Sequence, residues 1–160
     1  MKKILFALAL LIGSFATQAQ NFKTIKMAEL EKIIQPKDDK IYVVNFWATW
    51  CRPCIKELPY FERLQKKYAD KNVKVILLAV EDAEQKVKIF IKKKKIQAQV
   101  YLLTDAKVDQ WVPKVDKDWD GAIPVTLFIN GKTKKREFHM GDMTEADLNK
   151  KVESIVKQTK

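Results

Sequence analysis

Trp47-Ala48-Thr49-Trp50-Cys51-Arg52-Pro53-Cys54 is the stretch that decides the fold, and it holds the only two cysteines among the 160 residues. It completes an apolar run, Ile41 to Trp47, that is typical of a central strand covered on both faces. A predicted helix, Cys54 to Ala69, follows it directly. Two cysteines one helical turn apart at a strand-to-helix junction favour a redox-active pair.

The two cysteines have different predicted roles. Cys51 lies at the predicted helix N-terminus, where unpaired N–H groups and the helix dipole stabilise a thiolate, so it is the candidate nucleophile. Arg52 adds a positive charge beside it, and Pro53 supplies a helical φ without an N–H that would lack an intrahelical partner. Cys54 lies inside the first turn and is the candidate resolving thiol.

Two other uses of the cysteine pair are less consistent with the sequence. A structural disulfide across so short a loop would add only about 2 kcal/mol to the free energy of unfolding. Structural zinc is held by four ligands, whereas the chain has no third cysteine and its single histidine, His139, lies far along the sequence. We therefore expect neither a metal nor an organic cofactor.

Length and composition predict one exported domain. The 160 residues are 47% hydrophobic, enough for a single core. Residues 1–19 have the basic, apolar and small-polar regions of a secretory signal peptide, and Thr17 and Ala19 predict cleavage after Ala19. The domain then comprises residues 20–160 and works in the periplasm or another extracytoplasmic space, where disulfides form. An uncleaved N-terminal anchor is the alternative.

The formal net charge of +11 is concentrated in two places. One is the run Lys92 to Lys95, and the other is the segment Lys132 to Arg136, which includes Lys134 and Lys135. Such runs usually form a solvated surface. Attraction to an anionic membrane surface is a second interpretation, and nucleic acid is not an expected partner of an exported protein.

The remaining pattern predicts an α/β domain with a mixed sheet. The predicted strands are Ile41–Trp47, Val73–Val80, Gln99–Leu103, Val125–Ile129 and Lys134–Met140. The predicted helices are Met27–Gln35, Cys54–Ala69, Asp82–Ile96 and Thr144–Gln158. Strand, helix and strand in this order predict a right-handed parallel crossover. The strand Gln99–Leu103 is expected to be peripheral.

Two connections carry specific predictions. Asn130-Gly131 predicts a type I′ hairpin turn, because this dipeptide accepts positive φ angles. Thr104 to Gly121 is long for a loop without structure, so it is expected to be partly helical. Its Trp111 and Trp119 could line a substrate groove, although such residues more often pack a loop onto the core.

These motifs resemble the thioredoxin superfamily, and more narrowly its TlpA/ResA-like extracytoplasmic thiol:disulfide oxidoreductases. The block Asn45 to Cys54, continued by Glu57 and Pro59, is similar to that subgroup's Cys-x-x-Cys-x-x-Glu-x-Pro pattern. The segment Ile123 to Ile129 resembles the family's cis-proline strand, and Gly141 resembles its last strand-to-helix turn. The resemblance implies a thioredoxin-like fold, with a central mixed β-sheet flanked by helices on both faces.

The resemblance also implies that Pro124 is cis and lies against the cysteine pair. A cis bond turns the chain sharply, and proline has no N–H. The backbone groups of Ile123 would then be free to pair with an extended substrate segment, a short β-augmentation.

A base for Cys54 is less clearly indicated. Asn45 stands where cytoplasmic thioredoxin has a buried aspartate, cannot exchange a proton, and is expected to satisfy local hydrogen bonds. ResA-like members carry a glutamate after the next strand, for which Glu84 is the nearest match, with Glu81 and Asp82 as neighbours. The role of Glu57 is expected to be structural.

The resemblance implies an enzyme that reduces disulfides of exported proteins. Cys51 would attack the substrate disulfide and Cys54 would resolve the mixed disulfide. Trp47, Trp50 and Pro124 would frame an apolar platform around them. The electrons would come from a membrane-embedded donor of the thiol-transfer type, and the chain is expected to act as a monomer.

Two other functions stay open. One is a disulfide oxidase of the same fold. The other is a redox-inert binding module or metallochaperone that presents Cys51 and Cys54 to a soft ion such as Cu(I). A peroxidase of this superfamily would have threonine three positions before the reactive cysteine, where this chain has Ala48.

Overall fold

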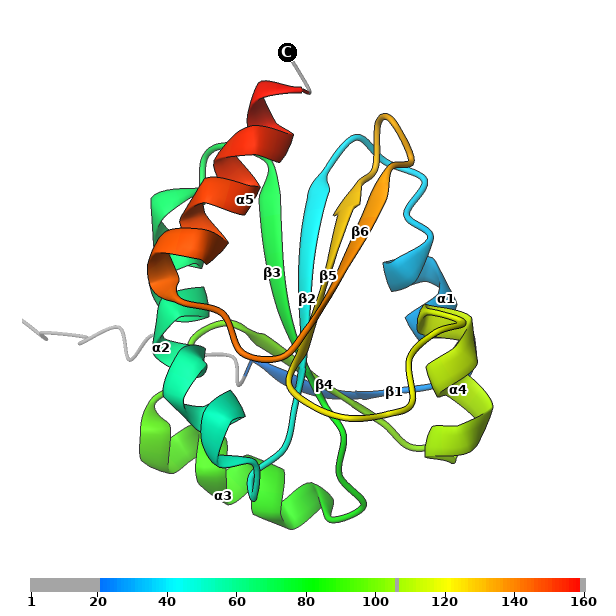
Figure 1. Ribbon diagram of the computed structural model, residues 1–160. Helices are drawn as coiled ribbons and strands as arrows, with labels where there is room; N and C mark the ends of the chain where they lie inside the picture. Colours follow the sequence, from blue (N-terminus) through cyan, green and yellow to red (C-terminus); the bar gives the residue numbers. More distant parts are fainter. Residues whose placement is uncertain (1–20, 106, 159–160) are drawn as a thin grey trace, which may run out of the picture.

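The computed structural model describes residues 21–105 and 107–158, and the predicted signal peptide, residues 1–19, lies outside them. A mixed six-stranded sheet in the order β1-β4-β3-β2-β5-β6 carries helices on both faces (Figure 1). The strands are β1 (Phe22–Ile25), β2 (Ile41–Trp47), β3 (Val73–Ala79), β4 (Gln99–Leu103), β5 (Val125–Asn130) and β6 (Arg136–Met140). The helices are α1 (Met27–Ile34), α2 (Arg52–Lys67), α3 (Glu84–Lys94), α4 (Val108–Val115) and α5 (Glu145–Lys157). Within the described residues, no helix combines the length and the apolar character needed to cross a bilayer.

Strand β2 lies in the middle of the sheet. It pairs in parallel with β3 and antiparallel with β5, and each of its side chains is buried. The continuous apolar run predicted such a strand, because both of its faces are covered. The expected α/β fold with a mixed sheet is confirmed.

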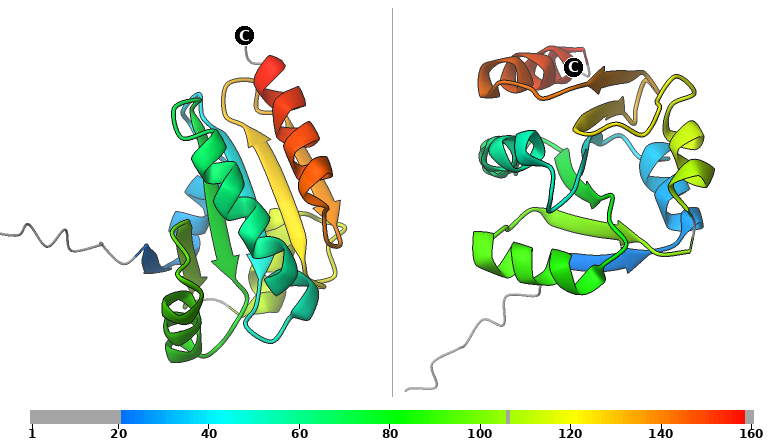
Figure 2. Two further views of the ribbon diagram at one scale, coloured as in Figure 1. Left: turned by 90° about the vertical axis from the view of Figure 1, so that its left-hand side faces the viewer. Right: turned by 60° about the horizontal axis from the view of Figure 1, so that its bottom comes forward.

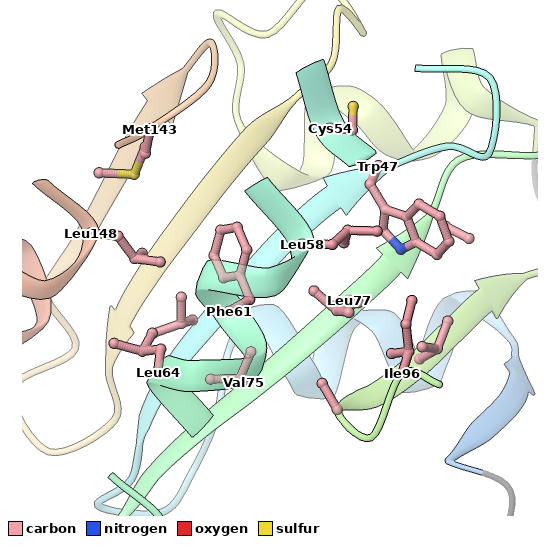
Figure 3. Packing of buried hydrophobic residues seen from close by; sticks show 14 of the residues in the cluster. Trp47, Cys54, Leu58, Phe61, Leu64, Val75, Leu77, Ile96, Met143 and Leu148 are labelled. Carbon is pink, nitrogen blue, oxygen red and sulfur yellow. The ribbon is translucent and has the colours of Figure 1, made fainter. Parts of the chain in front are cut away.

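The sheet separates two cores. On one face, α2, α3 and α5 cover alternate side chains of the sheet, and Figure 3 shows Leu58, Phe61 and Leu64 of α2 facing Val75 and Leu77 of β3. On the other face, α1 and α4 pack against the intervening side chains. The two sets of helices lie on opposite sides of the strands in Figure 2. This arrangement fixes the start of α2 at the carboxyl end of β2, where the cysteines lie.

One strand was not predicted. Strand β1 pairs in parallel with β4, so the segment Gln99–Leu103 is not the peripheral strand expected from the sequence. The sequence Phe22-Lys23-Thr24-Ile25 gives little signal, because only Ile25 is buried and the edge strand is short. It protects the edge of β4 from pairing with another chain.

The predicted type I′ turn at Asn130-Gly131 is wrong. Neither residue has a positive φ, and the connection is longer, with Lys134 in the left-handed region at φ 60°. The side-chain oxygen of Asn130 accepts hydrogen bonds from the N–H groups of Lys132 and Thr133, which closes an Asx-type turn. Gly131 is needed for a different reason, because a Cβ there would lie 2.2 Å from the backbone oxygen of Asp38.

The connection from β4 to β5 contains helix α4, as expected. Trp111 and Trp119 are buried and form a cluster with Phe46, their ring centroids 5.8 and 4.9 Å from that of Phe46. The indole N–H of Trp119 donates to the carbonyl of Ala122 at 2.7 Å. Both tryptophans therefore pack this segment onto the core and do not line a groove.

Candidate active site

The two cysteines form a disulfide at the start of α2. Their sulfurs are 1.98 Å apart and their Cα atoms 5.3 Å apart. Helix α2 begins at Arg52, two residues earlier than predicted, because Cys51 is its N-cap: the Cys51 Sγ accepts a hydrogen bond from the N–H of Cys54 at 3.3 Å. The sulfur of Cys51 thus lies at the positive end of the helix dipole, which favours a thiolate once the disulfide is reduced.

Exposure distinguishes the two sulfurs. Cys51 is 5% exposed and Cys54 is fully buried. Trp50, next to Cys51, is 67% exposed, the largest exposure among the large hydrophobic residues of the described chain. Arg52 and Pro53 are also exposed. A partner that approaches over Trp50 reaches Cys51 first.

The bond between Ile123 and Pro124 is cis, as the resemblance implied. The carbonyl oxygen of Ile123 lies 3.9 Å from the Cys51 Sγ, so this bond lies beside the cysteine pair. Pro124 is held in place because its own carbonyl accepts a hydrogen bond from the N–H of Gly141 at 3.0 Å. The geometry places a half-buried backbone segment beside the reactive sulfur, in position to bind an extended chain.

A groove of about 450 Å³ extends from this point. Trp50 and Ile123 line its cysteine end, and its far wall includes Val108 of α4. Glu81 also lines it and accepts two hydrogen bonds from Thr49, from the N–H at 3.1 Å and from the hydroxyl at 2.6 Å. Glu81 therefore holds the loop that carries the cysteines.

The other two acids proposed from the sequence lie apart from this contact. Asp82 lines the same groove and is exposed. Glu84 is the first residue of α3, where its carboxylate lies 2.5 Å from the ammonium of Lys88. The structure thus brings Glu81 to the cysteine loop and places Glu84 in an ion pair on a helix surface.

A buried polar network lies beneath the cysteine pair. Glu57, one turn after Cys54 on α2, is only 1% exposed. One of its carboxylate oxygens accepts a hydrogen bond from the amide of Asn45 at 2.8 Å, and the other accepts one from the N–H of Met143 at 3.0 Å. The same Asn45 amide donates to the hydroxyl of Thr126 at 3.2 Å. The network joins β2, α2, β5 and the turn before α5.

The environment of Glu57 favours its protonated form. Burial raises the pKa of Glu57 above its usual value of 4.5, and the nearby charge of Asp142 raises it further. The hydrogen bonds from Met143 and Asn45 lower the pKa but do not cancel the effect of burial. One turn after the buried cysteine, α2 therefore carries a buried carboxyl whose protonated form is favoured more than in an exposed glutamate.

Sequence reasoning assigned Glu57 a structural role and looked for a base at Glu84. The spacing held a better signal, because residues three apart share a helix face and Glu57 follows the buried Cys54 by three. Leu58 and Phe61, which are buried, show that this face of α2 is turned inward. A carboxyl on that face had to be buried with hydrogen-bond partners.

The described residues contain no group of side chains suited to hold a metal ion. Among residues 21–105 and 107–158, no three His, Cys, Asp or Glu side chains lie together as a metal-binding group. His139 lies in β6, paired with Thr126 of β5.

Comparison with known proteins gives consistent matches. A model of the AhpC/TSA family matches residues 11–137, a range that includes both the cysteine pair and the cis proline. The thiol-disulfide oxidoreductase ResA of Bacillus cereus is 33% identical over 141 residues, which cover 86% of this chain and 76% of that protein. The thioredoxin-like protein YneN of Bacillus subtilis is 31% identical over 140 residues, 85% of this chain and 77% of that one. The crystal structure of StoA from Bacillus subtilis matches with a TM-score of 0.58 and 27% identity, over 72% of this chain and 84% of that chain.

Proposed function

The chain belongs to the AhpC/TSA family and is a thiol-disulfide oxidoreductase of thioredoxin fold, and we propose that it works outside the cytoplasm as a reductase of protein disulfides. The observation that carries the proposal is the asymmetry of the cysteine pair. Cys51 lies next to Trp50 and Ile123, which line a groove, whereas Cys54 is fully buried. Such a pair suits a protein substrate that must reach one sulfur and then leave when the other attacks.

The proposed reaction is dithiol–disulfide exchange. The Cys51 thiolate attacks one sulfur of the substrate disulfide, a mixed disulfide forms, and the other substrate sulfur leaves as a thiolate. The Cys54 thiolate then attacks the Cys51 sulfur and releases the second substrate thiol. Two electrons pass to the substrate, and the enzyme is left with the Cys51–Cys54 disulfide.

The neighbouring residues have proposed roles in the first step. The N-terminus of α2 and the charge of Arg52 would stabilise the Cys51 thiolate, and Pro53 would preset the first turn. Trp50 would offer an apolar surface to the partner, and the backbone of Ile123 before Pro124 would pair with an extended segment around the partner's cysteine.

Glu57 is the proposed proton carrier for the second step. Cys54 must lose its proton before it attacks, and a buried thiol cannot pass it directly to water. The carboxyl of Glu57 lies one turn away on the same face of α2, and its raised pKa makes its carboxylate a stronger base than an ordinary one. We assign Glu57 this role in preference to Glu84, whose carboxylate pairs with Lys88.

The direction of transfer is tested by the midpoint potential. The purified protein is equilibrated with glutathione or dithiothreitol buffers, and the oxidised fraction of the Cys51–Cys54 couple is measured. A potential near that of thioredoxin, about −270 mV, is expected for a reductase supplied by an upstream donor. A potential near about −120 mV would make the protein an oxidant and would overturn the direction.

Export and partners complete the proposal. We propose that residues 1–19 are removed as a signal peptide, that the substrates are exported proteins with disulfides, and that a membrane-embedded thiol-transfer protein supplies the electrons. The names of the relatives, thiol-disulfide oxidoreductase ResA among them, support the activity. The mass of the protein recovered from the extracytoplasmic fraction should correspond to residues 20–160. Recovery of the full mass from the membrane fraction would support an uncleaved anchor.

A further inference from the structure

A second groove lies along α2, the helix that carries Cys54. It has a volume of about 330 Å³ and runs between α2 and the end of α3. It begins at Ile55, the residue after Cys54, and is closed at its far end by Gln97. None of the residues that line it lines the groove at Trp50 and Ile123.

The floor of this second groove is apolar. Ile55 and Leu58 come from α2, Phe90 comes from α3, and Ile96 follows α3. Its acidic residue, Glu62, is already engaged, because its carboxylate accepts hydrogen bonds from the N–H groups of Gln97 and Ala98. The backbone N–H and C=O groups inside α2 and α3 hydrogen-bond within each helix, so the floor offers an occupant mainly apolar contact.

The rim of the groove is basic. Arg63 and Lys66 rise from α2, and Lys94 and Lys95 lie at the end of α3. Arg63 forms an ion pair with Glu145 at 2.6 Å. Among the described residues, Lys66, Lys94 and Lys95 have no carboxylate within ion-pair distance. These three lysines thus outnumber the one carboxylate of the groove, that of Glu62, so the groove keeps a net positive charge.

Lys95 also has an unusual backbone conformation. Lys95 is the C-cap of α3 and has φ 54° and ψ 40°, the left-handed conformation in which glycine is strongly preferred. A side chain at this position strains the backbone. Lys134 of the β5–β6 connection has the same conformation, so what matters for the groove is only that Lys95 carries its charge at the rim.

The other basic segment behaves differently. The ammonium of Lys134 donates to the carbonyl of Pro36 at 3.0 Å, Lys135 pairs with Glu137 at 3.3 Å, and the guanidinium of Arg136 donates to the carbonyl of Val115. This segment lies at the end of the β5–β6 hairpin, at the top of Figure 1, whereas α3 lies at the bottom. The named hairpin cations serve the fold, whereas in the second groove Lys66 and Lys95 form no ion pair with any described residue and Lys94 lies over the ring of Phe90, 6.0 Å from its centroid.

We propose that the second groove binds the head group and the first acyl carbons of an acidic phospholipid, and so docks the domain on an anionic membrane surface. The unneutralised cations match the phosphate, and the apolar floor matches the acyl carbons. An acidic protein segment is the competing occupant, and the second test below distinguishes it from the lipid. This inference goes beyond the redox reaction and does not depend on its direction.

Docking would orient the active site. The start of α2 and the whole of α3 lie at the same end of the molecule in Figure 1 and in the right panel of Figure 2. Ile55 at the mouth of the second groove is one helical turn from Cys51. A lipid bound there holds the reactive sulfur close to the bilayer surface, within reach of a donor embedded in the membrane.

The first test measures binding of the full chain to phosphatidylcholine vesicles with and without phosphatidylglycerol. The double variant Lys94→Glu/Lys95→Glu is compared with Lys132→Glu/Lys135→Glu, which has the same change in net charge at the opposite end of the molecule. Because residues 1–19 are common to all variants, they contribute equally. We expect the groove variant to bind phosphatidylglycerol vesicles at least about twentyfold more weakly than the wild type, and the hairpin variant to lose less than about threefold. Equal losses in both variants would overturn the proposal, because they would show a response to net charge alone.

The second test detects occupation of the groove itself. The ring of Trp47 lies 5.2 Å from that of Phe90, which lines the groove, whereas Trp111 and Trp119 belong to the core on the other face of the sheet. Dihexanoyl phosphatidylglycerol, added below its micelle concentration, should shift the indole N–H signal of Trp47 in an NMR spectrum and leave the other two unchanged. Inorganic phosphate and polyglutamate are the control probes. A shift of equal size with phosphate would point to a free anion, one with polyglutamate would point to an acidic protein, and either would overturn the assignment to lipid.

The redox activity separates this proposal from the previous one. The rate of Cys51–Cys54 reduction by dithiothreitol should stay within about twofold of the wild-type rate in the Lys94→Glu/Lys95→Glu variant, because neither lysine lies in the catalytic site. Loss of lipid binding with an unchanged reduction rate would confirm that the second groove acts in docking only. A matching loss of both would overturn the proposal and assign the lysines to the redox site.

Discussion

The two sides of the cysteine pair are built differently. On the outer side, Cys51 lies between the exposed ring of Trp50 and the backbone of Ile123, at the end of an open groove. On the inner side, Cys54 and the carboxyl of Glu57 share a face of α2 that is closed to solvent. The outer side can select a partner, and the inner side can control a proton. Access of a partner to Cys51 and proton transfer at Cys54 therefore depend on different residues, so a substitution can alter one without the other.

Removing each sulfur in turn gives the largest expected effect. Cys51→Ser should lower the rate of disulfide reduction about a thousandfold or more, because the outer sulfur is the proposed nucleophile. Cys54→Ser should still attack and should accumulate a mixed disulfide with the substrate, since the resolving thiol is missing. Mass spectrometry after reaction with a disulfide peptide measures the trapped species. Trapping by Cys51→Ser in place of Cys54→Ser would reverse the two roles.

Glu57→Gln tests the inner side. We expect the rate of mixed-disulfide resolution to fall about tenfold to a hundredfold, because the amide cannot accept the proton of Cys54. The inflection of the rate with pH above 4.5, the usual value for this carboxyl, should disappear. Glu62→Gln is the matched control, since it makes the same change on the same helix at a carboxylate that bonds to Gln97 and Ala98. A pH profile that keeps its inflection in Glu57→Gln would remove Glu57 from the reaction.

The pH dependence of stability gives an independent test of Glu57. Its pKa is raised in the folded protein, so folding favours the protonated form. The contribution of Glu57 to the free energy of unfolding should therefore be largest below pH 4.5. It should fall as the pH rises from 4.5 through the raised pKa of the folded protein. The loss amounts to about 1.4 kcal/mol for each unit by which the two pKa values differ. Urea unfolding of the wild type and Glu57→Gln across this range measures the loss. The amide can keep fewer hydrogen bonds, which lowers the stability of the variant at every pH. The comparison therefore concerns the slope of the free energy of unfolding against pH, not its absolute value. Parallel curves for the two proteins would contradict the raised pKa.

Trp50→Ala tests the outer side, with a smaller effect. Truncation of the exposed ring should raise the KM for a protein substrate about fivefold and change the stability by less than about 0.5 kcal/mol. The control is Trp119→Ala, which removes a buried ring and should lower the stability by about 3 to 5 kcal/mol without a comparable change in KM. Steady-state kinetics and urea unfolding of both variants give the comparison. If Trp50→Ala leaves KM unchanged, the partner does not pass over this ring.

The two acids near the outer groove should give the smallest effects. Glu84→Gln removes an exposed ion pair with Lys88, which contributes no more than about 0.5 kcal/mol to stability, and the reduction rate should change less than about twofold. Glu81→Gln should lower the rate more, by about threefold to fivefold, because this carboxylate holds Thr49 and hence the cysteine loop. Dithiothreitol oxidation kinetics measure both. A larger loss in Glu84→Gln would restore that residue as a candidate base.

Local patterns predicted much of this molecule. The unbroken apolar run of Ile41–Trp47 could only be a strand covered on both sides, and the cis bond at Pro124 followed from the motif that surrounds it. The failures came from contacts between distant segments. Gly131 serves a close approach to Asp38, and Asn45 and Glu57 meet across the interior of the molecule, where no sequence period records the pairing. Strand β1 was missed because an edge strand with one buried residue has almost no hydrophobic pattern.

The hydrogen bond from Met143 to Glu57 also bears on when the site becomes complete. These two residues are 86 positions apart, far more than the 12 positions between Glu57 and Asn45. Contacts this distant in sequence form only after the intervening chain has been ordered. In a chain that emerges from the ribosome or the export machinery N-terminus first, the two cysteines therefore appear long before the carboxyl beneath them has both of its partners. Until the turn before α5 docks, Glu57 lacks its hydrogen bond from Met143, so the surroundings of this carboxyl are completed later in folding than the α2 N-terminus that holds Cys51.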